Sequence, residues 1–231
     1  MFSSAIERLN ERRDATGDAG EDAGFTLIEL MVVLLILAIL LAIAIPTFLG
    51  VTKSANDRAA QSNLNTALTN AKASYQSQGQ SYLSTTVTSP TLFATALQSA
   101  EPALTFGTTN STSQGNISVQ VSSDGNGIVL AALSKSSNNC WIVVDNPTAP
   151  TGTSNAPWGT TQTGASGAVV TGTGQNVVVP GSGTGQQGTF YAEIKGGSVS
   201  GTTMATDCAA AQPIIPTGAS YEWQSSGFPA L

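Results

Sequence analysis

The first strong pattern along the chain is an apolar stretch with almost no polar interruption. Within residues 25–45 only Thr26 and Glu29 are polar, and every residue from 30 to 45 is Leu, Ile, Val, Ala or Met. A helix of about 20 apolar residues is long enough to cross the hydrocarbon core of a bilayer. The pattern therefore predicts a transmembrane helix close to the N-terminus.

Beyond residue 50 the helical pattern continues but becomes amphipathic. From residue 51 to about residue 78, apolar side chains recur at spacings of three to five residues, which places them on one face of a helix. These positions are Ala55, Ala60, Leu64, Leu68, Ala71 and Tyr75. We expect this face to pack on a globular head and the opposite face to be solvated. Pro46, followed by Gly50, predicts a kink or soft point between the two halves.

After a Gly-containing break at residues 78–81, turn and strand signals replace the helical pattern. A short helix is expected at residues 89–97, with Ser89 as its N-cap and Pro90 at its first position. Strands are expected at residues 117–121 and 128–133, which a hairpin connection joins, and at residues 140–145 and 189–195. The fold class that these elements predict is α+β, in which a long N-terminal α-helix packs on an antiparallel β-sheet head.

Residues 146–188 separate the last two expected strands and are rich in Thr, Gly, Pro, Ser and Asn. We interpret this segment as an insertion on the head that carries one weak hairpin, formed by Val-rich patches at residues 168–171 and 176–179. A surface of this composition is compatible with adhesion, with immune-evasive variability or with simple spacing. The sequence does not choose among these uses.

Glu29 is the one carboxylate inside the apolar stretch. A charge at the centre of a membrane span costs about 2.5–3.5 kcal/mol on insertion scales, so a partner is expected. If the chain were cut between Gly24 and Phe25, the new α-amine would lie one helical turn before Glu29, on the same face. In a packed assembly of such helices, the amine of one subunit would neutralise Glu29 of its neighbour.

The residues Gly24-Phe25-Thr26-Leu27-Ile28-Glu29-Leu30 resemble the processing site of type IV prepilins and of the related type II secretion pseudopilins. The resemblance covers residues 24–50 closely. It implies that a membrane prepilin peptidase cuts after Gly24 and methylates the amine of Phe25, and that Glu29 guides subunit docking. It also implies a helix that loosens near Pro46 in the assembled fibre. The chain would then divide into a leader (1–24), a transmembrane and fibre-core helix (25–50) and the rest of the helix with an extracellular head (51–231).

The N-terminal 24 residues do not fit an ordinary secretory signal peptide, whose apolar core of about 7–15 residues is shorter than the one found here. They contain three arginines and six acidic residues, so they are net acidic, whereas many leaders of the family carry basic residues closer to the cut. Arg12 and Arg13 nevertheless favour a cytoplasmic N-terminus. The expected course is storage in the cytoplasmic membrane, followed by export into a fibre on the cell surface.

The charge of the chain argues against direct nucleic-acid binding. Charged residues make up 10% of the sequence, compared with roughly 25% in an average soluble domain. The net charge is −6, and removing the leader with its three basic and six acidic residues would change it to −3. No strongly basic footprint is present. If a fibre of this chain takes up DNA, a local patch or another subunit must bind it.

Cys140 and Cys208 are the only cysteines in the chain. An even cysteine number in an exported domain suggests a disulfide, which would contribute roughly 4 kcal/mol in the chain-entropy model. The resemblance supports this pairing, because many type IV pilins attach the C-terminal part of the head to a sheet strand in this way. A zinc site is a poor alternative, since the chain has no His and no C-x-x-C pair. We expect neither a metal nor a cofactor.

The absence of histidine also excludes Ser-His-Asp and Cys-His catalytic arrangements. Residues 183–188 match G-x-G-x-x-G, but they lie in a Gly-rich tract and lead into an expected strand, whereas a dinucleotide site needs a helix there. Asp145 and Glu193 are expected to be solvated strand ends rather than a catalytic pair. The sequence therefore predicts a protein that is not an enzyme.

The C-terminal segment contains Tyr221, Trp223 and Phe228. We expect Trp223 and Phe228 to cover the sheet near Cys208 and to hold down an end that would otherwise fray. An aromatic patch that binds a receptor is the alternative.

These observations, with the resemblance, indicate a structural subunit of a type IV pilus that serves adhesion, motility or DNA uptake. Its expected partners are other pilin subunits, the prepilin peptidase, the pilus assembly machinery, the membrane before assembly, and surface receptors or DNA. A minor pilin or a type II secretion pseudopilin is an alternative within the family. An alternative of another class is a membrane-anchored surface binding module.

Overall fold

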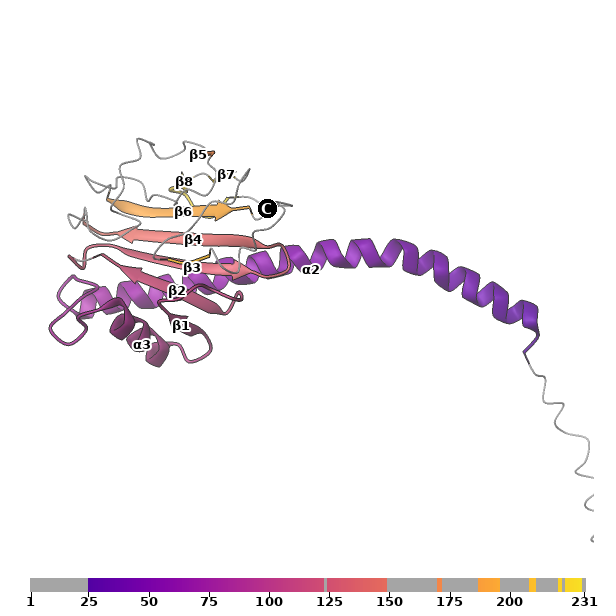
Figure 1. The fold of residues 1–231 in the computed structure, drawn as a ribbon, viewed down its shortest axis with the longest axis horizontal. Coiled ribbons are helices and arrows are strands. Elements are labelled where there is room, and N and C mark those ends of the chain that lie inside the picture. The colour runs from indigo at the N-terminus through magenta and orange to yellow at the C-terminus, as the bar shows by residue number, and fades with distance from the viewer. Residues whose placement is uncertain are drawn as a thin grey trace, which may run out of the picture. The chain divides into compact units, whose positions relative to one another are not determined.

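The computed structural model describes residues 25–122, 124–148, 170–171, 187–195, 208–210, 220–221 and 223–229 (Figure 1). The chain divides into two compact units, and the division falls between Leu49 and Gly50. This point lies inside the long helix α2 (Leu27–Ser77), so the two halves of α2 belong to different units.

The N-terminal half of α2 is apolar and uncovered. Its large apolar side chains, together with the preceding Phe25, range from 47% exposed at Leu37 to 86% exposed at Phe25. Among the described residues, α2 is the one helix long and apolar enough to cross a membrane. The expected apolar helix is therefore present. It stays helical through Pro46 and Gly50, and the kink at these residues remains a prediction.

The C-terminal half of α2 packs on the head through one face, as its amphipathic pattern predicts. The buried residues are Asp57, Ala60, Leu64, Ala67, Leu68, Ala71 and Tyr75. The prediction was wrong at Ala55, which is exposed, and it omitted Asp57. Asp57 can be buried because its carboxylate accepts hydrogen bonds from Trp141 Nε1, at 3.1 Å, and from the hydroxyl of Ser137.

The second helix, α3 (Pro90–Ala100), confirms the expected short helix. Ser89 Oγ accepts a hydrogen bond from the backbone N–H of Leu92 at 3.3 Å, and Pro90 occupies the first turn. These two features satisfy or remove backbone donors that a helix start otherwise leaves unpaired. Helix α3 buries Phe93 and Leu97 and lies beside the first two strands of the sheet (Figure 1).

The head contains a six-stranded sheet in the order β1-β2-β3-β4-β6-β8 (Figure 1). Its strands are β1 (Thr105–Gly107), β2 (Asn116–Val121), β3 (Ile128–Ser134), β4 (Asn139–Asn146), β6 (Gly188–Ile194) and β8 (Trp223–Gln224). The four strands expected from the sequence correspond to β2, β3, β4 and β6. The sheet is antiparallel, as expected, except at β1. The sequence did not predict β1, which pairs parallel to β2 and is too short to show an alternating pattern.

The segment between β4 and β6 departs from the sequence-based expectation. Asn146 and Gly188 are themselves paired in the sheet, so the insertion begins after β4 ends. Strand β5 (Val170–Thr171) pairs antiparallel with β7 (Ser220–Tyr221). The first patch of the expected hairpin, residues 168–171, is described at Val170 and Thr171, and these two residues pair with the C-terminal segment. The other patch, residues 176–179, lies outside the described residues.

Both faces of the sheet are covered, and β3 is buried along all seven of its residues. Side chains that alternate along each strand point to opposite faces. The face toward α2 and α3 carries Ile117, Val119, Leu130, Ala132, Trp141 and Val143. The opposite face carries Val129, Leu133, Cys140, Ile142, Val144 and Phe190, together with Cys208 and Ala210.

Phe228 covers the sheet, as expected, but on the face opposite to Cys208. Its ring contacts Trp141 and Tyr191 edge to face, with ring centroids 5.7 and 4.8 Å apart. Trp141 faces α2, whereas its neighbour Cys140 faces the other way and bonds Cys208. The expectation that Phe228 lies near Cys208 is therefore wrong. The side chain of Trp223 lies outside the described residues.

Asp145 is buried, at 4% exposure, and the expectation that it is a solvated strand end is wrong. Its carboxylate accepts hydrogen bonds from the Tyr82 hydroxyl, at 2.6 Å, and from Thr189, and lies 3.0 Å from Lys72 Nζ. Burial, and then the charge of Asp145, raise the pKa of Tyr82. The hydroxyl therefore stays protonated and donates. This network ties the C-terminal half of α2 and the residues after it to β4 and β6.

We predict that Asp145→Ala destabilises the head. The change leaves the buried Tyr82 hydroxyl without its acceptor, which costs about 1–3 kcal/mol in the free energy of unfolding. Urea unfolding of the full chain in detergent, followed by tryptophan fluorescence, measures this loss. Glu101→Ala removes a partly exposed carboxylate just after α3 and serves as the matched control. Equal unfolding midpoints for the two variants would contradict the role of Asp145.

Candidate processing and assembly site

Helix α2 begins with a reciprocal pair of side chains. Thr26 precedes the first helical residue, and Glu29 lies in the first turn. The backbone N–H and the hydroxyl of Thr26 donate to Glu29 Oε2 at 2.9 and 2.8 Å. The backbone N–H of Glu29 donates in return to Thr26 Oγ1 at 3.3 Å. This is a capping box, in which two otherwise unpaired backbone donors of the helix start are satisfied by side chains.

The capping box fixes where the Glu29 carboxylate lies. Because Oε2 bonds to Thr26, the carboxylate is held back toward the helix start, close in sequence to Phe25. The positive end of the helix dipole also favours a negative group there, by about 0.3–1 kcal/mol. The sequence reasoning identified Glu29 but missed Thr26 as its partner. The available signal was the T-x-x-E spacing directly before an apolar run.

The other expected N-terminal residues are placed as follows. Phe25 precedes the cap and is 86% exposed, and Gly24 lies outside the described residues. Pro46 lies within α2, and the hydroxyl of the next residue, Thr47, donates to the carbonyl of Ile43 at 3.0 Å. Cleavage after Gly24, methylation of Phe25 and the docking role of Glu29 remain predictions.

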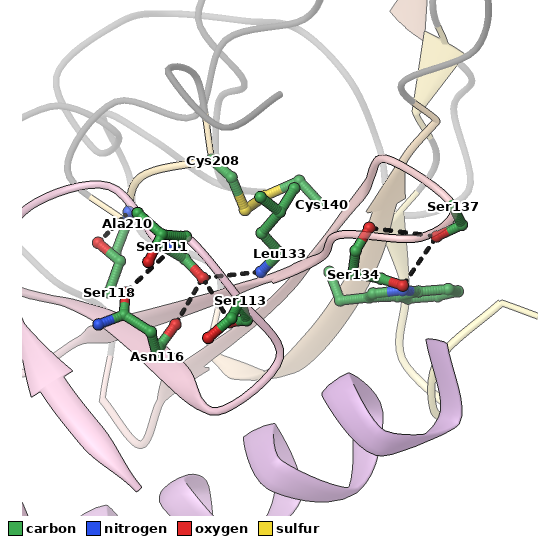
Figure 2. The surroundings of a disulfide bond; sticks show 12 residues. Ser111, Ser113, Asn116, Ser118, Leu133, Ser134, Ser137, Cys140, Cys208 and Ala210 are labelled. Atoms are coloured by element: carbon green, nitrogen blue, oxygen red, sulfur yellow. Dashed lines mark hydrogen bonds between the residues drawn. A yellow bond between two sulfur atoms is a disulfide. The ribbon is translucent and has the colours of Figure 1, made fainter. Parts of the chain in front are cut away.

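The two cysteines form the expected disulfide, which joins residues 68 positions apart (Figure 2). Cys140 lies on β4, and its side chain points to the sheet face opposite α2. The bond stabilises by roughly 4 kcal/mol in the chain-entropy model, mainly by restricting the unfolded chain. A disulfide of this kind is typical of a domain that folds in an oxidising compartment.

The short segment Cys208–Ala210 is attached to the sheet by more than the disulfide (Figure 2). The carbonyl of Cys208 accepts from the backbone N–H of Ser111 at 2.7 Å, and the N–H of Ala210 donates to Ser118 Oγ at 2.9 Å. Ser111 Oγ also accepts from the N–H of Leu133 at 2.8 Å. Buried serine hydroxyls therefore pair the backbone groups where this segment crosses the sheet.

No metal site is formed by the described part of the chain, in which no group of three or more His, Cys, Asp or Glu side chains is placed to hold an ion. Glu193, like Asp145, is buried rather than solvated, at 5% exposure, which corrects the second strand-end expectation. The Asp145 carboxylate contacts Tyr82, Lys72 and Thr189. The Glu193 carboxylate contacts Asn139 and Lys195.

Comparison with known proteins finds a family motif in the N-terminal segment. A family model described as the prokaryotic N-terminal methylation motif matches residues 21–45, which include the capping box and much of the apolar half of α2. No curated protein and no solved structure matches the chain. The motif and the long apolar helix together support a type IV pilin-like prepilin, and the α+β architecture fits the pilin fold.

We predict that Thr26→Val weakens the start of α2. The change removes the hydroxyl that both donates to and accepts from Glu29, and losing an N-cap costs about 1 kcal/mol. Amide hydrogens of the first turn should then exchange roughly five-fold faster. Hydrogen exchange of the full chain in detergent micelles measures this difference. Thr26→Ser keeps the hydroxyl and should exchange like the parent, and equal exchange in the two variants would contradict the capping box.

Proposed function

We propose that this chain is the structural subunit of a type IV pilus. In this proposal it is stored in the cytoplasmic membrane as a prepilin, cut between Gly24 and Phe25, and methylated on the new amine. It then polymerises through the apolar half of α2 into an extracellular fibre. The observation that carries the proposal is an uncovered apolar helix whose start bears a capped carboxylate, within the matched methylation motif.

The apolar half of α2 needs a non-aqueous environment in both states of the subunit. Lipid covers it before assembly, and neighbouring helices cover it in a fibre. Lipid tails are as apolar as leucine side chains, so this exchange depends on packing and polar pairing rather than on the hydrophobic effect. The helix surface alone therefore specifies little about the register between subunits.

Glu29 supplies that register in our proposal. An unpaired carboxylate in an apolar core is costly, and an amine placed against it removes much of that cost. Thr26 bonds Oε2 of Glu29, which leaves Oε1 to accept from the amine of Phe25 on a neighbouring subunit. The favoured register is then the one that brings each Phe25 amine to the next carboxylate.

The proposed course of processing and polymerisation determines which partners the chain has. A prepilin peptidase cuts and methylates the chain, the pilus assembly machinery extracts it from the membrane, and further copies of the chain receive it. In this proposal the head with its disulfide faces the outside, where it serves adhesion to surface receptors or motility. DNA uptake fits less well, because the processed chain would carry a net charge of −3.

Two alternatives share part of this evidence. A minor pilin or a type II secretion pseudopilin would carry the same N-terminal motif, and its low abundance in material sheared from the cell surface distinguishes it. A membrane-anchored binding module would keep α2 in the bilayer permanently. That module would be recovered in membranes with its leader still attached.

We predict that Glu29→Ala and Glu29→Gln both leave cleavage intact and stop fibre growth. Gln retains the acceptor that a capping box needs but has no charge, so this pair of variants separates the cap from the charge. Immunoblots of sheared and membrane fractions measure the outcome, and Glu101→Gln, on the head, is the matched control. Normal amounts of sheared fibre from Glu29→Gln would contradict the docking role of the charge.

A further inference from the structure

Three side chains of different chemistry meet at one end of the β4–β6 pair. Asn139 is the first residue of β4, and Lys195 directly follows the last residue of β6. The antiparallel register pairs Cys140 with Ile194 and Trp141 with Glu193. Continuing this register by one residue places Asn139 opposite Lys195. Residues two apart on a strand share a face, so Asn139, Glu193 and Lys195 lie on the α2 side of the sheet with Trp141.

The carboxylate of Glu193 lies between the other two groups. Its Oε1 accepts a hydrogen bond from Asn139 Nδ2 at 2.8 Å, and its Oε2 lies 3.7 Å from Lys195 Nζ. Glu193 is 5% exposed, and its neighbour in the register, Trp141, is fully buried. One buried carboxylate is thus shared by a primary amine and a carboxamide.

The surroundings make this carboxylate a stronger base than an ordinary glutamate. Burial is the main cause that raises the pKa of Glu193, and the charge of Asp57 raises it further, while Lys195 lowers it. Asp57 is itself held in place by Trp141 Nε1 and Ser137. A base with a raised pKa takes up a proton more readily and can return it to a leaving group.

We propose that Lys195 and Asn139 form an intramolecular isopeptide bond, with Glu193 as the group that carries the proton. The product would be a covalent link between β4 and β6 that reduction does not break. This proposal rests on the contacts within the head and does not depend on pilus assembly.

The reaction balances without any further reagent. Glu193 Oε2 takes a proton from the ammonium of Lys195, and the freed lone pair of Nζ attacks Cγ of Asn139. The carbonyl π bond opens, which leaves Nζ with two hydrogens and a positive charge. The carboxyl group of Glu193 turns to bring its proton to Nδ2, the nitrogen that Oε1 contacts in the structure, and the freed carboxylate then takes one proton from Nζ. The Cγ–Nδ2 bond then breaks and the carbonyl re-forms. An amine and a carboxamide become a secondary amide, and ammonia is released together with the proton of the original ammonium.

The positions of Lys195 and Asn139 and the exposure of Lys195 are compatible with this reaction. The Lys195 side chain is 65% exposed, so released ammonia has a direct route to solvent. Its flexible four-carbon stem allows Nζ to turn from Glu193 onto Cγ of Asn139. Asn139 also directly precedes Cys140, whose side chain points to the opposite face and carries the disulfide. The two covalent links would fasten the same end of β4 from both faces.

Mass spectrometry of the full chain, after reduction of the disulfide, tests the proposal. The reduced protein should be lighter than its sequence by one molecule of ammonia. Lys195 is the last basic residue of the chain, and Lys135 is the one before it. Trypsin cannot cut after a lysine whose Nζ is acylated, so residues 136–231 should remain in a single peptide. A full-mass protein that gives separate peptides on either side of Lys195 would overturn the proposal.

Single substitutions test the proposed roles of Lys195, Asn139 and Glu193. Lys195→Arg and Asn139→Ala should have full mass, and Lys135→Arg, which changes an exposed lysine of the β3–β4 turn, should still lack one ammonia. Glu193→Gln should also have full mass while retaining the disulfide, which reports that the head still folds. A loss of ammonia that persists in Lys195→Arg would come from cyclisation of an asparagine and would overturn the proposal. Crosslinking at the parental level in Glu193→Gln would overturn the assigned role of Glu193.

Discussion

The carboxylate of Glu29 at the start of an apolar helix is the constraint on which this account depends. Side chains along the first half of α2 are uncovered in the described chain, so this segment needs lipid or other helices around it. Lipid satisfies the apolar surface but leaves one charge poorly paired. The capping box with Thr26 reduces this cost by bonding one carboxylate oxygen within the chain. In the proposed function, the other oxygen, Oε1, binds the Phe25 amine of a neighbouring subunit and thereby selects the register.

The head has a different requirement, which is to remain folded with few charged residues. Its sheet is buried on both faces, and a disulfide holds the segment that crosses the face opposite α2. The carboxylates of Asp57, Asp145 and Glu193 are all buried, and each accepts a hydrogen bond from a side chain on another element. Buried charges of this kind contribute little net stability, because the cost of removing them from water offsets much of what their partners contribute.

Periodicity and local signals in the sequence predicted most elements of this fold. Short-range sequence patterns predicted four features: the apolar run, the apolar face on the second half of α2, the Ser89 cap and the four main strands. Each pattern is the periodicity or the capping signal of one element. The pairing of Cys140 with Cys208 followed from an even cysteine count in a chain expected to be exported, together with the resemblance. Strand β1 was missed because three residues carry no period, and its parallel pairing depends on contacts distant in sequence.

The errors about polar residues have a common physical cause. Asp145 and Glu193 resemble solvated strand ends in sequence, because their bonding partners come from other elements. The face on which Phe228 packs has the same kind of cause. Cys140 and Trp141 point to opposite faces because they are neighbours on a strand, but the sequence does not show which of the two the C-terminal segment contacts. At the N-terminus, by contrast, the capping box was readable from T-x-x-E, since both partners lie within one turn.

The most direct test of the central claim is the mass of the N-terminal tryptic peptide of protein sheared from the cell surface. Lys53 is the first basic residue after the apolar helix, so the processed chain should give a peptide of residues 25–53. The account predicts that this peptide begins at Phe25 and carries one added methyl group. Absence of the protein from the sheared fraction, with an uncut chain beginning at Met1 in the membrane, would contradict it.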